Sequence, residues 1–180
     1  SLVFLNNQSG QGLLETIIAL GIIGSGIIGM LSLTVANQTA SVDSSEQLIA
    51  ANLAREGMEA ARNLRDSNWL WRGVWDQGLE DGADYTAAPL FDKGANTWTF
   101  DFIADDLDHN FARLWRAGGV YFQSTEAFPA GAVLTAYRRL LQLDEICADK
   151  TVMVSGSSCN PAINPKIGVK VQSIVEWQSK

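Results

Sequence analysis

The feature that most constrains this chain is a run of about 21 residues, Thr16–Ala36, without a single charged side chain. A helix rises about 1.5 Å per residue, so such a run can cross a hydrocarbon core roughly 30 Å thick. Its apolar residues fall on every face, and a helix that is apolar all round is buried in a core or in lipid. One acid, Glu15, stands directly before the run. A charge at that depth is expensive unless it is paired, so we expect Glu15 to have a function.

A glycine precedes Glu15 at a fixed spacing. The segment Gly10-Gln11-Gly12-Leu13-Leu14-Glu15, followed by a hydrophobic helix, resembles the processing site of type IV pilins and the related pseudopilins. The resemblance implies that a membrane-embedded aspartic peptidase cuts between Gly10 and Gln11 and methylates the new amine of Gln11. Residues 1–10 would then be a leader peptide, with Glu15 the fifth residue of the mature chain. The family most often has Phe where this chain has Gln11, but the cleavage rule depends mainly on the Gly and the Glu.

The resemblance also implies a function, a location and partners. We expect a structural subunit, a minor pilin or pseudopilin, that polymerises through its hydrophobic helix with other pilin subunits. The prepilin peptidase, the inner-membrane assembly platform and membrane lipid would be its further partners. The subunit would be a single-pass inner-membrane protein with its globular domain outside, and would join an extracellular or periplasmic filament. Two alternatives stay open: a pseudopilin of a type II secretion or DNA-uptake system, and an uncleaved, membrane-anchored binding protein.

Glu15 itself supports an assembly role on physical grounds. No Lys or Arg lies near it in the sequence, so the terminal amine of a neighbouring subunit is the nearest candidate partner. A mispaired register would leave a buried charge, at a cost on the order of 3–5 kcal/mol. The plainer alternative is that Glu15 lies at the headgroup level of an ordinary signal anchor.

Four glycines interrupt the apolar run, and each weakens a helix by about 1 kcal/mol relative to Ala. They are Gly21, Gly24, Gly26 and Gly29. They could let neighbouring helices approach closely, let the helix extend locally during assembly, or simply reflect ordinary membrane-helix composition.

Beyond Ala36 the helical pattern continues to about Arg65, with apolar residues at helical spacing and charged residues on the other faces. A helix from Leu13 to Arg65 would be roughly 80 Å long. We therefore expect a transmembrane and assembly helix over residues 11–36, an amphipathic continuation over 37–66, and a globular β-rich domain over 67–180.

The rest of the chain reads as short strands at turn-like spacing. They are expected at Thr97–Phe102, Val120–Phe122, Leu134–Ile146, Thr151–Val154 and Ile167–Trp177. The predicted fold class is α+β: a long N-terminal helix, membrane-spanning in its first half, packed on a C-terminal antiparallel sheet as in pilins.

Residues 66–92 read as a linker that contains Trp69, Trp71 and Trp75. These rings could bind a ligand such as a carbohydrate. We favour the alternative that they cap the helix end and pack beneath the sheet.

Cys147 and Cys159 are the only cysteines, with 11 residues between them. In an exported domain such a pair predicts one disulfide, worth about 3 kcal/mol.

The sequence offers little that indicates catalysis. It contains one His, no nucleophile motif and no Gly-rich phosphate loop, so we expect no enzymatic activity and no cofactor. An acidic cluster could hold Ca²⁺, although a solvated turn is the favoured interpretation. Its members are Asp101, Asp105, Asp106 and Asp108. A net charge of −7 argues against nucleic-acid binding.

Overall fold

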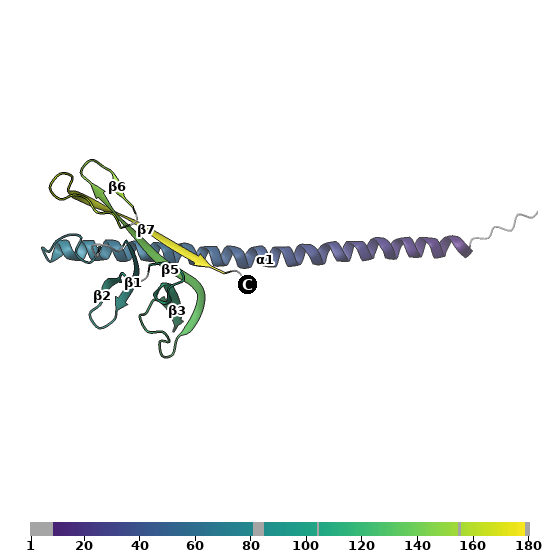
Figure 1. The fold of residues 1–180 in the computed structure, drawn as a ribbon. Coiled ribbons are helices and arrows are strands. Elements are labelled where there is room, and N and C mark those ends of the chain that lie inside the picture. The colour runs from purple at the N-terminus through teal and green to yellow at the C-terminus, as the bar shows by residue number, and fades with distance from the viewer. Residues whose placement is uncertain (1–8, 81–84, 104, 155, 179–180) are drawn as a thin grey trace, which may run out of the picture. The chain divides into compact units, whose positions relative to one another are not determined.

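The computed structural model describes residues 9–80, 85–103, 105–154 and 156–178 (Figure 1). It confirms the predicted fold class, because a long N-terminal helix accompanies a C-terminal antiparallel sheet in an α+β arrangement. The chain divides into two compact units, Ser1–Ser45 and Glu46–Lys180.

Helix α1 spans Ser9–Leu70 and so runs five residues beyond the predicted end at Arg65. Hydrogen bonds from one side chain near its end, Asn68, fix the position of the segment that follows the helix. The Asn68 amide donates to the carbonyl of Trp75 at 3.2 Å and to that of Gln77 at 2.8 Å. These bonds fold the segment after the helix back against its last turn.

Seven strands and one short 3-10 helix follow. They are β1 (Thr86–Asp92), β2 (Thr97–Asp101), η1 (Asn110–Ala112), β3 (Arg113–Ala117), β4 (Val120–Phe122), β5 (Val133–Cys147), β6 (Val152–Met153) and β7 (Lys166–Trp177). The five predicted strands are all present, with end points within two residues of those expected.

Two strands were not predicted. Strand β1 lies within the segment read as a linker, and β3 was not anticipated at all. The Ala87-Ala88-Pro89 sequence of β1 has low strand propensity. Pairing and burial compensate, since Ala87 and Ala88 are completely buried.

Strand β5 is the centre of the sheet. Strand β7 pairs with β5 from Tyr137 to Cys147. Strands β1, β3 and β6 each pair with shorter stretches of β5. Because these stretches include residues that also pair with β7, the three short strands lie on the side of β5 opposite β7.

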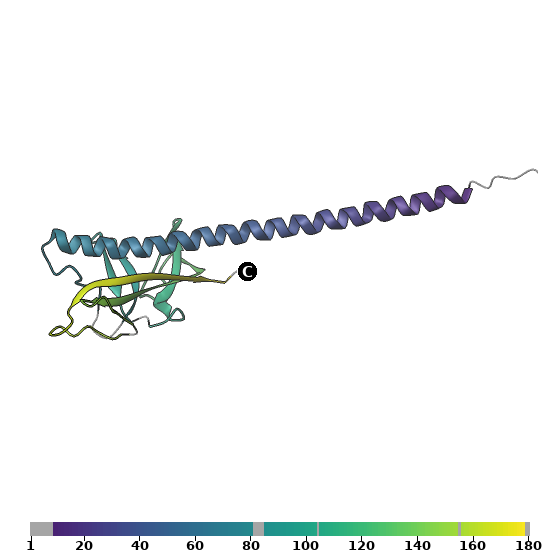
Figure 2. The ribbon, with the colours of Figure 1, turned by 90° about the horizontal axis from the view of Figure 1, so that it is seen from above.

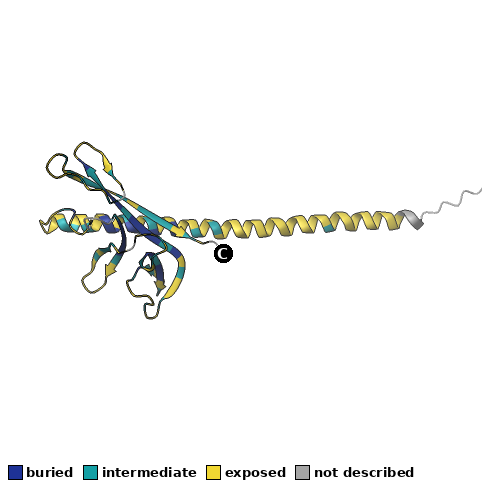
Figure 3. Cartoon of the chain, viewed as in Figure 1, coloured by how far each residue is buried: buried dark blue, intermediate teal, exposed yellow. Residues whose placement is uncertain are grey.

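The second half of α1 lies along one face of this sheet (Figure 2). Small residues of the helix form the contact: Ala61 packs in one cluster with Leu141 and Leu143, and Ala50 packs in another with Tyr137. In Figure 3 the buried positions gather where this helical segment meets β5.

Gly57 shows how close the helix and sheet are. A methyl group added there would lie 2.8 Å from Ser173 Oγ and 2.9 Å from Leu141 Cδ2. Real Cβ atoms do not approach other atoms so closely, so any larger residue here would force the Ser173 and Leu141 side chains to shift.

Candidate functional site

The large apolar residues of the first unit are exposed wherever the structure describes them. Those between Leu13 and Val35 are each between 53% and 71% exposed. Their helix is the one, within the described residues, long and apolar enough to cross a membrane. An exposed apolar surface of this extent marks an interaction with lipid or with protein.

The hydroxyl groups within the run are satisfied by the helix itself. Thr16 Oγ1 donates to the Gly12 carbonyl at 2.6 Å, and Ser32 Oγ donates to the Ile28 carbonyl at 3.0 Å. Ser25 and Thr34 make equivalent bonds. Polar side chains that bond back to the preceding turn can enter hydrocarbon at little cost.

Glu15 is exposed on α1, at the front of this surface. Residues 1–45 contain no Lys, Arg or His. Residues 1–45 therefore supply no basic side chain to pair with the Glu15 carboxylate.

The other residues of the predicted processing site are only partly described. The backbones of Gly10 and Gln11 lie in α1, whereas their side chains and residues 1–8 lie outside the described residues. The leader, the cleavage between Gly10 and Gln11 and the methylation of Gln11 stay predictions.

In the second unit, one buried arginine joins helix to sheet. Arg139 is 1% exposed, and its guanidinium donates to the Leu53 carbonyl and to Glu56 Oε2, both at 3.0 Å. Its Nε donates to Gln123 Oε1 at 2.9 Å. Burial lowers the pKa of Arg139, although the neighbouring Glu56 carboxylate opposes the shift. Sequence analysis missed Arg139. The feature that could have revealed it is a charged residue at a position of β5 where the alternation of the strand places buried, mostly apolar residues.

A second charged cluster surrounds Lys166 at the start of β7. Its ammonium group pairs with the carboxylates of Asp76 and Glu80, and lies 3.8 Å from Glu145 Oε1. Burial alone would lower the pKa of Lys166, but hydrogen bonds to Asp76 and Glu80 outweigh it and the pKa is raised. The cluster fastens the segment after α1 to the sheet.

The disulfide stands beside this cluster. Cys147 and Cys159 are bonded, with a Cα–Cα distance of 5.6 Å. The backbone N–H of Cys159 donates to Glu145 Oε2 at 2.6 Å. The bridge closes the loop that contains β6.

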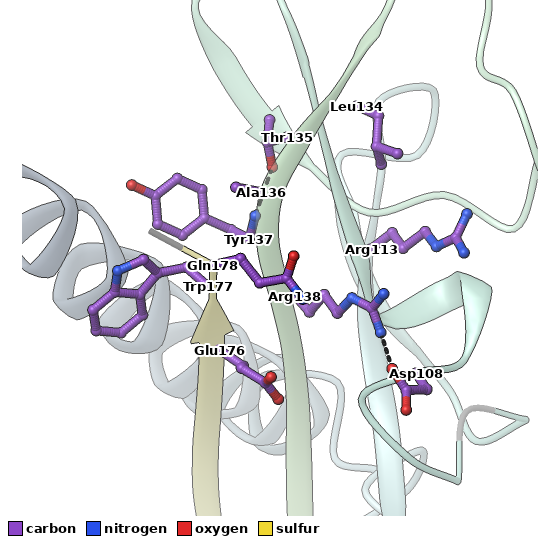
Figure 4. Close-up of a pocket in the computed structure, with 10 residues that line it drawn as sticks. All are labelled: Asp108, Arg113, Leu134, Thr135, Ala136, Tyr137, Arg138, Glu176, Trp177 and Gln178. Atoms are coloured by element: carbon purple, nitrogen blue, oxygen red, sulfur yellow. Dashed lines mark hydrogen bonds and ion pairs between the residues drawn. The ribbon is translucent and has the colours of Figure 1, made fainter. Parts of the chain in front are cut away.

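A pocket of about 220 Å³ opens beside β5 and the end of β7 (Figure 4). Arg138 lines it and pairs with Asp108, while Tyr137 N–H donates to Thr135 Oγ1 at 3.3 Å. The Thr135 hydroxyl in turn donates to the Leu114 carbonyl at 2.7 Å. Burial, followed by the nearby Glu46 carboxylate, raises the pKa of Tyr137. This is an arrangement of structural hydrogen bonds and one ion pair.

The preferred interpretation of the tryptophans is wrong for two of the three. Trp69 is 66% exposed and Trp71 is 86% exposed, so neither packs beneath the sheet. Helix α1 continues to Leu70, so Trp69 lies in its last turn and Trp71 follows directly after it. Trp75 is half-buried beside Leu79.

The acidic cluster is used for local structure. Asp101 accepts the N–H of Ile103, Asp106 accepts that of His109, and Asp108 pairs with Arg138. Within the described residues, no three His, Cys, Asp or Glu side chains come together as a metal site.

No known protein family, curated protein or solved structure matches this chain. The resemblance to type IV pilins therefore rests on Gly10–Glu15 and the apolar run that follows.

Proposed function

We propose that this chain is a non-enzymatic structural subunit, a minor pilin or pseudopilin, of a type IV pilus-like filament. The observation that carries the proposal is the exposed apolar helix with a single carboxylate, Glu15, directly before its uncharged run. Cleavage after Gly10 gives Gln11 a free amine four residues from that carboxylate. In a filament, the amine of one subunit neutralises Glu15 of the next while the apolar surfaces stack.

The second unit suits such a role because it is held to α1 by interactions within the chain. Arg139 fixes the helix to β5, and the apolar clusters around Ala50 and Ala61 bury the rest of the contact. A domain attached in this way follows its helix into an assembly without refolding. A pseudopilin of a secretion or DNA-uptake system would share every one of these features.

The processing step separates this proposal from an uncleaved, membrane-anchored binding protein. The chain is expressed with a prepilin peptidase and its N-terminus is determined by mass spectrometry. The proposal expects a terminus at methylated Gln11. An intact leader in the presence of active peptidase would contradict it.

The chain provides a matched control two residues away. Gly10→Val is expected to abolish cleavage, because the peptidase requires a small residue there. Gly12→Val makes the same chemical change where an added Cβ meets no other atom within 4 Å, and cleavage should persist. Equal processing of both variants would count against Gly10 as the cleavage residue.

A further inference from the structure

Strand β7 has a long edge without a partner strand. It contains 12 residues, pairs with β5 along one side, and meets no strand on its other side within the described chain. The strands at the opposite side of the sheet are much shorter: β2 has five residues and β4 has three. A long unpaired edge is a template for another strand, and proteins usually keep such edges short or protected.

The backbone groups on this edge can be identified. Leu143 N–H donates to the Tyr85 carbonyl at 2.7 Å and Cys147 N–H to the Thr151 carbonyl at 2.9 Å, both away from β7. Odd-numbered residues of β5 therefore face β1 and β6, and even-numbered ones face β7. Since Gln142 pairs with Gln172, the even-numbered residues of β7 bond to β5. The odd-numbered ones direct their N–H and C=O groups to the free edge: Val169, Val171, Ser173, Val175 and Trp177.

We propose that this edge binds the β7 strand of a second copy of the chain, antiparallel and centred on Ser173. In this register Val171 lies opposite Val175 of the second copy, and Val169 lies opposite its Trp177. Every outward-facing N–H and C=O between Val169 and Trp177 then has a partner.

Charge complementarity selects the register. The register centred on Ser173 places Lys170 opposite Glu176 of the second copy. Because the pair is symmetric, the same Lys170–Glu176 contact occurs a second time with the roles of the two chains exchanged. Both side chains are exposed, and the two positions form non-hydrogen-bonded pairs, in which side chains lie closest, with Cβ atoms about 4.5–5.5 Å apart. Lysine on an edge normally opposes pairing, but here it meets an acid.

The face toward α1 supports the same register. Ser173 Oγ is buried and makes no hydrogen bond to any described residue. In the pair, two Ser173 side chains lie opposite each other on this face, where one hydroxyl can donate to the other.

The helices leave room for the contact. Helix α1 lies over the boundary between β5 and β7, since Gly57 lies against both Leu141 and Ser173. In the pair, the two α1 segments would therefore be about two strand spacings apart, roughly 10 Å. Packed helices are about 8–10 Å apart, so the two segments can lie side by side. Because Gly57 lies against Ser173, the symmetry also brings Arg55 level with Glu59 of the second copy. Both residues line the groove between α1 and β7.

The pair reverses the direction of the second chain, because its twofold axis stands perpendicular to the sheet. Subunits of one filament run in the same direction. The β7 contact therefore differs from the helix stacking proposed above.

A charge reversal tests the contact on the full chain in detergent, with oligomeric state measured by analytical ultracentrifugation. Glu176→Lys places two lysines opposite each other twice and should weaken the dimer at least tenfold. Glu126→Lys changes the net charge equally on an exposed loop and should leave the dimer intact. Equal dimer dissociation constants for the two variants would overturn the proposal.

Cysteine cross-linking tests the register and excludes dimers made by the apolar helices. Gln172 lies opposite Ile174 of the second copy, so Gln172→Cys chains mixed with Ile174→Cys chains should form an intermolecular disulfide. Each variant alone should cross-link several-fold less. Absence of preferential cross-linking in the mixture would overturn the register, whatever the outcome for prepilin processing.

Discussion

The two units of this chain use charge in opposite ways. Residues 1–45 present exposed apolar side chains with one carboxylate, Glu15, directly before the apolar run, and contain no basic residue. In the second unit, by contrast, Arg139 pairs with Glu56 and Lys166 pairs with Asp76 inside the chain. The second unit is thus stabilised by its own contacts, whereas the proposed function assigns the partner of the first unit to another subunit. Substitutions in the second unit should change its unfolding, and those in the first should change assembly.

The largest effect on unfolding is expected at the buried arginine. Arg139→Met leaves Glu56, Gln123 and the Leu53 carbonyl without their donor, and should lower the free energy of unfolding by about 3–5 kcal/mol. The matched control is its neighbour: Arg138 pairs with Asp108, whose side chain is 92% exposed, so Arg138→Met should cost only about 1 kcal/mol. Denaturant titration in detergent measures both. Similar losses of unfolding free energy in the two variants would contradict the claim that the buried arginine stabilises the second unit more than the exposed ion pair does.

The disulfide should come next. Replacing both Cys147 and Cys159 by Ala releases the loop around β6 and should cost about 3 kcal/mol. Thermal unfolding of the double variant should match that of the reduced wild-type chain. A double variant as stable as the oxidised wild type would show that the bridge does not stabilise the second unit.

Two glycines of the same helix sharpen the comparison between the units. Gly57→Ala forces a methyl group against Ser173 and Leu141, and should cost about 1–3 kcal/mol. Gly29→Ala adds a methyl group where no atom lies within 4 Å, and should leave unfolding of the domain unchanged. Denaturant midpoints distinguish the two, and a destabilising Gly29→Ala would mean that the units are coupled.

The smallest effect should be a pH dependence from Lys166. Its pKa in the folded chain is raised above the ordinary 10.5, so folding favours the protonated form. The resulting stability, roughly 1 kcal/mol, is fully present below pH 10.5 and is lost as pH rises through the folded pKa. The difference in stability between wild type and Lys166→Gln should therefore shrink above pH 10.5. A constant difference across this range would contradict the role of the ammonium charge.

The sequence was informative where periodicity was strong. The apolar run predicted the helix, and alternation in β2 and β7 together with turn-like spacing predicted five strands in an antiparallel sheet. It failed where tertiary contacts decide the outcome: Ala87 and Ala88 form a strand because β5 and the core cover them, not because alanine favours strands. Trp69 and Trp71 were misplaced because their position depends on where α1 ends, which is set by bonds from Asn68 to residues up to nine positions away. The role of Arg139 depends on Leu53 and Glu56, more than 80 residues earlier in the chain.

The central claim is that the first unit assembles through a carboxylate that needs a partner from another subunit. The most direct test compares filament formation by Glu15→Ala with that by Asp43→Ala, which removes the one other carboxylate of residues 1–45. Both are expressed with peptidase and assembly platform, and sheared filaments are quantified by electron microscopy and immunoblot. We expect filaments to be lost in Glu15→Ala and retained in Asp43→Ala, with both chains processed and inserted in the membrane. Wild-type numbers of filaments from Glu15→Ala would contradict the account.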